Sequence, residues 1–170
     1  MKPTDADPAA FWDYSLRIYA NPGVADACIS LQDRHGCDVN VLLLCLWLAE
    51  TGRLVLQASD IEAIQRSAAA TNERLVQPVR EVRRWFKLWS EDAIAAEPHA
   101  SAYKALKEAE LHGERMVQSQ LIAGMNLAAF GSAPTAEAAA RASFDNYRKT
   151  FPETDGAASE LDGLVAKVWH

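Results

Sequence analysis

The residues from 32 to 40 carry the groups in this chain that are best suited to acid–base chemistry. His35 has a side chain that exchanges a proton near neutral pH, and Asp33 or Asp38 could orient its ring as a general base. A cleft beside this segment would then bind a small ligand or form an active site. The candidate residues of this polar corner are Gln32, Asp33, His35 and Asn40, with Glu110 and Glu114 from later in the chain.

The same residues have a purely structural interpretation. Asp38 precedes an apolar run and is a suitable helix N-cap, while His35 falls in the last turn of the helix before it. Asn40 lies inside the apolar run, where an unpaired amide would cost about 1–3 kcal/mol. We therefore expect Asn40 to have a buried polar partner. The candidates are Gln32, Asp33, Glu110 and Glu114.

The segment that follows Pro78 forms a second candidate site, because its helical projection is sharply two-faced. Its basic face would dock an acidic protein, a phosphate-bearing ligand or RNA. Two alternatives remain open: a solvated face over the core, or internal ion pairs with Glu110 and Glu114. The basic residues are Arg80, Arg83, Arg84 and Lys87, and the opposite face, expected in the core, holds Val82, Trp85, Phe86 and Trp89.

Metal, cofactor and nucleophile motifs are missing from the sequence. His35-Gly36-Cys37 offers at most two zinc ligands, and the spacing Glu-x-x-His of paired-helix metal sites does not occur. There is no G-x-S-x-G motif and no glycine-rich phosphate loop. We expect the three cysteines, Cys28, Cys37 and Cys45, to be reduced and buried. The sequence thus predicts no cofactor and no metal, and favours a non-enzymatic protein.

The fold is predicted around residues 39–51, which are apolar on every side of a helix instead of along one stripe. Such a helix must be covered all round, so we place it at the centre of a compact all-α bundle of six or seven helices. Residues 7–151 form this domain. Residues 152–170 add a loop and a weakly attached C-terminal helix.

Local signals predict several details of this bundle. Gly52 is the expected glycine after the central helix, and residues 53–58 are read as a loop whose leucines reach the core. Ser59 and Glu62 have the spacing of a capping box at the start of the next helix. Pro78 is expected to kink or divide that helix.

Composition and charge fit one globular domain. The chain has 170 residues, 49% of them hydrophobic, and a formal net charge of −6. An acidic chain is a poor general nucleic-acid coat, although a local basic patch remains compatible with RNA binding. The N-terminus has no apolar core of a signal peptide, and no apolar run reaches the length of a membrane span. We expect a cytoplasmic protein.

Several motifs resemble a small bacterial family of helical proteins, known only as a domain of unknown function of about 160 residues. The resemblance is dense from residue 11 to 49, looser at 78–80 and 110–115, and ends before about Phe130. It implies a helical cytoplasmic protein and transfers no functional residue. The motifs that carry it include Phe11-Trp12-Asp13-Tyr14-Ser15-Leu16, Leu31-Gln32-Asp33-Arg34-His35-Gly36 and Leu43-Leu44-Cys45-Leu46-Trp47.

Three functions follow from these observations. The first is an interaction or regulatory module that binds an unknown acidic protein through the basic helix face. The second is a small-ligand-binding protein or enzyme with a cleft at the 32–40 corner. The third is association with RNA or the ribosome, which would weaken steeply with salt.

Overall fold

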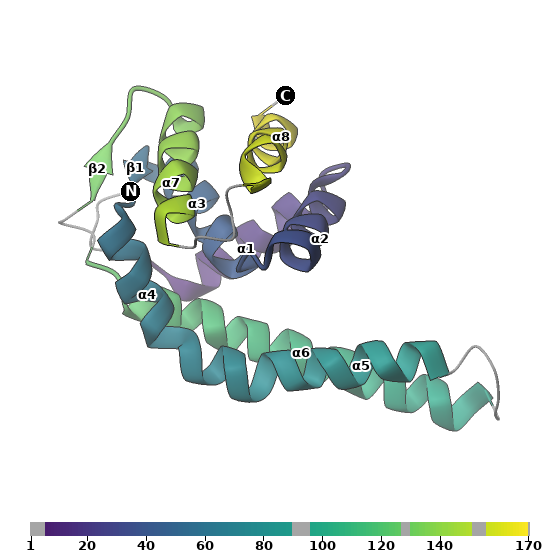
Figure 1. Cartoon of the computed structure of the whole chain (residues 1–170). Helices are drawn as coiled ribbons and strands as arrows, with labels where there is room; N and C mark the ends of the chain where they lie inside the picture. The colour runs from purple at the N-terminus through teal and green to yellow at the C-terminus, as the bar shows by residue number, and fades with distance from the viewer. Residues whose placement is uncertain (1–5, 90–95, 127–129, 151–155, 170) are drawn as a thin grey trace.

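The computed structural model describes residues 6–89, 96–126, 130–150 and 156–169, and within them the predicted all-α fold is confirmed (Figure 1). Because α4, η1 and α5 follow one another without a break, the eight α-helices of the described residues form seven continuous rods. The elements are α1 (Pro8–Tyr19), α2 (Val24–His35), α3 (Val39–Gly52), β1 (Leu54–Val55), α4 (Ala58–Thr71), the π-helical turn η1 (Asn72–Val76), α5 (Gln77–Trp89), α6 (Ala96–Ala123), β2 (Gly131–Ser132), α7 (Ala136–Thr150) and α8 (Ala158–Trp169).

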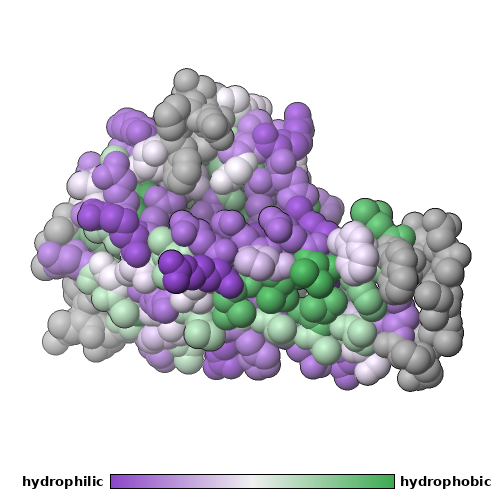
Figure 2. Space-filling view, turned by 60° about the horizontal axis from the view of Figure 1, so that its bottom comes forward, coloured by the Kyte–Doolittle hydropathy of each residue, from purple (hydrophilic) through white to green (hydrophobic). Residues whose placement is uncertain are grey.

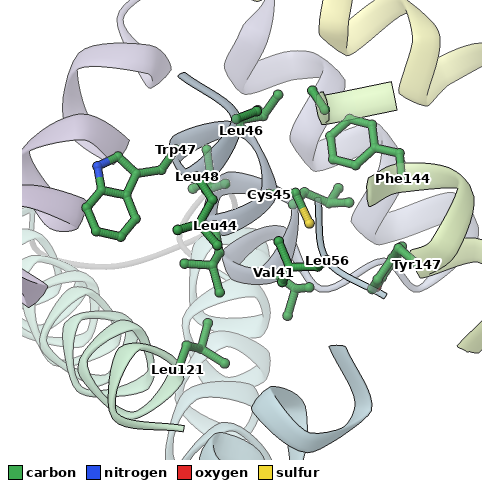
Figure 3. Packing of buried hydrophobic residues seen from close by; sticks show 14 of the residues in the cluster. Val41, Leu44, Cys45, Leu46, Trp47, Leu48, Leu56, Leu121, Phe144 and Tyr147 are labelled. Carbon is green, nitrogen blue, oxygen red and sulfur yellow. The ribbon is translucent and has the colours of Figure 1, made fainter. Parts of the chain in front are cut away.

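Helix α3 is the buried centre that the sequence predicts. The carboxylate of Asp38 caps it by accepting hydrogen bonds from the backbone N–H groups of Asn40 (3.0 Å) and Val41 (3.4 Å). All ten residues from 40 to 49 are buried. Figure 3 shows side chains from α6 and α7 surrounding the helix, among them Leu121 and Phe144. The core is therefore one cluster around α3, to which nearly every other helix contributes.

The end of α3 corrects two sequence predictions. Gly52 is still helical, and Arg53 is the residue with left-handed backbone (φ 53°) that ends the helix. The following segment is not entirely a loop, because β1 pairs antiparallel with β2 near residue 131. Its partner strand is only two residues long and has no alternating pattern, so the sequence did not reveal it. Leu56 is fully buried, as predicted.

The capping box of α4 begins two residues earlier than predicted. Gln57 is the N-cap, and its backbone N–H donates to the carboxylate of Asp60 at 2.9 Å. The predicted pair, Ser59 and Glu62, falls inside the helix. The error is one of register: two acidic residues are available, and the backbone selects the one that lies three residues after the true cap.

The predicted kink at Pro78 is confirmed. Figure 1 shows the helix changing direction between α4 and α5, and η1 occupies the turn just before the proline. The N–H of Gln77 bonds to the carbonyl of Asn72, five residues back. A proline removes one N–H donor and crowds the preceding turn, so a wider turn at this point relieves the clash.

The α5 and α6 helices form a hairpin that extends to one side of the bundle (Figure 1). Gly113 of α6 lies against η1, where an added Cβ would come within 2.9 Å of Val76. A glycine is required here because the two helices approach closely. This approach fixes how α6 faces α5.

Helix α8 packs against α2 and α7 and supplies Leu161, Leu164 and Val165 to the core. Residues 151–155, which begin the predicted connecting loop, lie outside the described residues. The predicted division of the chain at residue 151 stays a prediction. The side chains of α8 nevertheless belong to the same buried cluster as α3.

Candidate functional site

The basic face of α5 points inward, against α6. Arg80 bonds to Glu110 (3.0 Å) and to Glu114, and Arg83 bonds to Glu110 through two nitrogens. The side chains of Arg80 and Glu110 are only 18% and 13% exposed. For Arg80 and Arg83, internal pairing is the alternative that the structure has, whereas Arg84 and Lys87 are exposed.

On the opposite face of α5, Val82 and Trp85 point outward, so their predicted place in the core is wrong. Val82, Trp85 and Leu88 are 46%, 59% and 71% exposed. Phe86 is partly buried and stacks on His99, and the side chain of Trp89 lies outside the described part of the chain. Figure 2 shows hydrophobic surface gathered over the α5–α6 hairpin. Helix α5 thus exposes its apolar side because its charges are paired within the protein.

The ion pairs continue into the core as a chain of hydrogen bonds. The amide of Asn40 donates to Glu114, one of the four partners that the sequence suggested, and accepts a bond from Gln118 at 3.0 Å. Gln118 also donates to the hydroxyl of Ser15 at 3.1 Å. Sequence reasoning missed Gln118, although the spacing of 110, 114 and 118 places all three on one face of α6.

The two glutamates of this network have opposite pKa shifts. Burial raises the pKa of Glu114, and the bonds from Asn40 and Arg80 only partly offset it. Burial also disfavours the charged form of Glu110, but the hydrogen bonds from Arg83 and Arg80 outweigh it and lower its pKa. Glu114 is therefore the carboxyl of the network that is protonated more readily.

The remaining basic residues lie closer to solvent. Arg84 bonds to Asp33 of α2 at 2.6 Å, and both side chains are nearly half exposed. This bond lowers the pKa of Asp33. An exposed pair of this kind adds little stability and exchanges partners easily. Arg84 is thus held much less firmly than Arg80.

His35 does not join Asp33 or Asp38 in an acid–base pair. Its Nε2 lies 3.0 Å from the carboxylate of Glu160 in α8, which also accepts a bond from Ser30. The carboxylate of Asp38 is occupied by the N-terminus of α3. The structural interpretation of these two residues therefore holds, and His35 helps to attach α8 to α2.

An apolar cleft of about 500 Å³ lies between α1, α2, α3, α5 and α6. One part of its lining is the polar network, including Asn40, Glu110 and Glu114, and Arg84 and Lys87 also line it. Gln32 and Asp33 line it as well. The apolar residues of the cleft are Trp12, Leu16, Tyr19, Ile29, Val39, Leu43 and Leu111.

A larger polar cleft of about 1050 Å³ lies beside it, between the α2–α3 corner and the α4–η1–α5 rod. Amide and charged side chains dominate its lining, and the π-helical turn supplies Asn72 and Glu73. The two clefts share a wall that contains Asp33, Asn40 and Arg84. Of the polar corner predicted from the sequence, Gln32, Asp33 and Asn40 lie in this shared wall, whereas Glu110 and Glu114 line only the apolar cleft and His35 lines neither.

Thiol and metal chemistry find no support in the described residues. Burial raises the pKa of Cys28 and Cys45 to about 12 and that of Cys37 to about 11, so the three thiols stay protonated. No group of three or more metal-binding side chains gathers in the part of the chain that the structure describes. Among the same residues, no helix is long and apolar enough to cross a membrane.

A comparison with protein families matches residues 10–121 to the family described as "Protein of unknown function (DUF2390)". The match joins the densely resembling segment of α1–α3 to the looser ones in α5 and α6, and it ends before Phe130. Every residue that lines the apolar cleft lies within the matched range. No curated protein and no solved structure matches the chain. The chain belongs to the DUF2390 family, whose function is unknown.

Proposed function

We propose that this protein binds a small amphipathic molecule in the apolar cleft. One observation carries the proposal: hydrophobic side chains from four helices line a cleft of about 500 Å³ together with a buried polar network. Small-molecule sites are typically concave, of about 300–1,000 Å³, and mostly apolar with a few fixed polar groups. The proposal develops the ligand-binding alternative that the sequence suggested for the 32–40 corner.

Exposed apolar residues around the cleft support this function. Leu16, Ile29 and Leu111 are 52%, 49% and 52% exposed, and they come from three different helices. Single exposed leucines are common in soluble proteins, but three around one cleft form a hydrophobic wall. A ligand with an apolar body would cover them, and each square ångström removed from water contributes about 25 cal/mol.

The buried polar network in the wall of the cleft is fixed before any ligand arrives. Asn40 is held from one side by Glu114 and from the other by Gln118, and Arg80 is held by two glutamates. Side chains that are already ordered lose little conformational entropy on binding. This arrangement favours a binding site over a surface that orders only around a partner.

Substitution of Leu111 tests the proposal. We expect Leu111→Gln to weaken binding of an amphiphilic probe such as decanoate about tenfold, since the variant loses about 1.4 kcal/mol of apolar contact. Isothermal titration calorimetry measures this change. Met116→Gln is the matched control, because Met116 lies on the same helix, is 50% exposed and does not line the cleft. Equal effects of the two substitutions, or no binding by the wild type, would refute the proposal.

A second candidate, docking of an acidic protein partner on the basic face, is favoured by the exposure of Arg84. Arg80 and Arg83 are occupied by α6, so such a partner would have to reach Arg84 and Lys87. Arg84→Glu should then abolish the interaction while leaving the fold intact. RNA in place of a protein would be identified by steep weakening between 50 and 200 mM salt. For either function we propose a cytoplasmic location in a bacterium.

A further inference from the structure

The lining of the apolar cleft has more hydrogen-bond donors to offer than acceptors. Both oxygens of Glu110 accept bonds from Arg80 and Arg83, and both oxygens of Glu114 accept bonds from Asn40 and Arg80. These carboxylates therefore have little left for a cationic ligand. A guanidinium has five N–H donors, and Arg84 commits one nitrogen to Asp33.

The balance of charges in the lining also favours an anionic ligand. Four cationic side chains line the apolar cleft, whereas the carboxylates are Asp33, Glu110 and Glu114. In the polar cleft the balance is reversed, with five carboxylates against three guanidinium groups. An anion is thus favoured in the apolar cleft and disfavoured across the shared wall. The cations of the apolar cleft are Arg80, Arg83, Arg84 and Lys87.

Arg84 can change its partner more easily than Arg80 can. Its bond to Asp33 joins two side chains that are 46% and 42% exposed, whereas the bonds of Arg80 are shielded between α5, α6 and α3. Arg84 and Lys87 lie three residues apart on α5, so both can approach one group from the same side. A charge-assisted bond to a ligand carboxylate would replace the exposed bond to Asp33.

We infer that the ligand of the apolar cleft is an anionic amphiphile, with an apolar body against Leu16, Ile29 and Leu111 and an anionic end bound by Arg84 and Lys87. This inference rests on the proposed function, because it assigns the charge of the ligand in the same cleft. It excludes ligands whose polar end is a cation or a neutral donor.

Three probes with the same chain test the inference: decanoate, decanol and decylammonium, each titrated into the full chain by calorimetry below its micelle concentration. We expect decanoate to bind at least about tenfold more tightly than either of the others. The double variant Arg84→Gln/Lys87→Gln should weaken decanoate about tenfold and leave decanol unchanged. Arg84→Lys keeps the positive charge and should therefore retain part of the preference for decanoate over decanol that the double variant loses.

Arg66→Gln is the matched control, because Arg66 is an exposed arginine that lines only the polar cleft. It should leave all three affinities unchanged, and circular dichroism should show the same helicity in every variant. If decanol or decylammonium binds as tightly as decanoate while Leu111→Gln still weakens binding, the inference fails and the proposed function stands. If Leu111→Gln weakens the binding of none of the three probes, both the inference and the proposed function fail.

Discussion

Helices α3 and α5 differ in how well the sequence pattern predicts which residues are buried. Helix α3 has no polar side and is buried on every side, as its composition predicts. Helix α5 is sharply two-faced, yet Arg80 and Arg83 of its basic side face α6, and its apolar side faces solvent at Val82, Trp85 and Leu88. A uniformly apolar helix has one possible place, whereas a two-faced helix can turn either way. Amphipathic periodicity therefore shows that α5 has two faces without showing which one is inside.

The difference has a physical cause in α6. Glu110 and Glu114 lie one turn apart and meet Arg80 and Arg83, which are three residues apart on α5. Once two carboxylates stand in a partly buried position, only cations can face them without a large desolvation cost. The arginines are thereby drawn inward, and Val82, Trp85 and Leu88 stay outside.

The largest effect is expected in α3. Leu44→Ala removes a fully buried side chain from the centre of the core, and unfolding free energy should fall by about 3–5 kcal/mol. Leu88→Ala, at a 71% exposed position of α5, is the matched control and should change it by less than about 0.5 kcal/mol. Urea denaturation measures both. Similar losses in the two variants would mean that α5 is buried in solution.

A smaller loss is expected at the inward face of α5. Arg80→Ala leaves Glu110 and Glu114 without their shared cation, and we expect a loss of about 2–3 kcal/mol because the site is only partly buried. Arg84→Ala breaks an exposed pair and should cost no more than about 1 kcal/mol. If the two variants lose equal stability, the inward assignment of the basic face is wrong.

The two glutamates should respond to pH in opposite directions. The pKa of Glu110 is lowered below its usual 4.5, so its contribution to stability is present above pH 4.5 and is lost as the pH falls through the folded value. The pKa of Glu114 is raised above 4.5, so its contribution is present below pH 4.5 and is lost as the pH rises through the folded value.

Glutamine substitutions separate the contributions of Glu110 and Glu114 to the pH dependence of stability. Glu110→Gln should reduce the loss of stability below pH 4.5, and Glu114→Gln should reduce the decline above pH 4.5. Denaturation midpoints recorded from pH 3.5 to 7.5 give both slopes. If both substitutions changed the pH dependence of stability in the same direction, the pKa values of Glu110 and Glu114 would not be shifted in opposite directions.

The smallest effect is expected at the outward face. Trp85→Gln should change the unfolding free energy by no more than about 0.5 kcal/mol, because the side chain of Trp85 is 59% exposed. Trp47→Gln offers the contrast, since Trp47 is buried and stacks on Phe11 at 5.2 Å. A large loss for Trp85→Gln would show that its ring packs inward.

Short-range features of the fold were predictable. Asp38 caps α3, as expected, and two further local signals are the N-cap of α1 at Asp7 and the end of α2 at Gly36 with φ 65°. Each of these signals acts within four residues of the chain. The β1–β2 pair and the bond between Asn40 and Gln118 were missed, because they join residues that are about 75 or more positions apart.

The candidate site was predictable only in part. The need of Asn40 for a buried partner follows from a polar residue in an apolar helix, and Glu114 meets it. The position of His35 was not foreseeable, because its partner Glu160 comes from α8, 125 residues later. A cleft depends on the angles at which five helices meet, and no local pattern specifies those angles.

By itself, the sequence determined the all-α class, the cap of α3 at Asp38 and the burial of α3, because hydrogen bonding and periodicity act along one segment at a time. It also determined that Asn40 must be paired. Only the tertiary structure decided which face of α5 turns inward and where the apolar cleft opens. Those outcomes depend on charges and surfaces brought together by chain segments about 30 or more residues apart, since burial of one face is favourable only against a complementary partner.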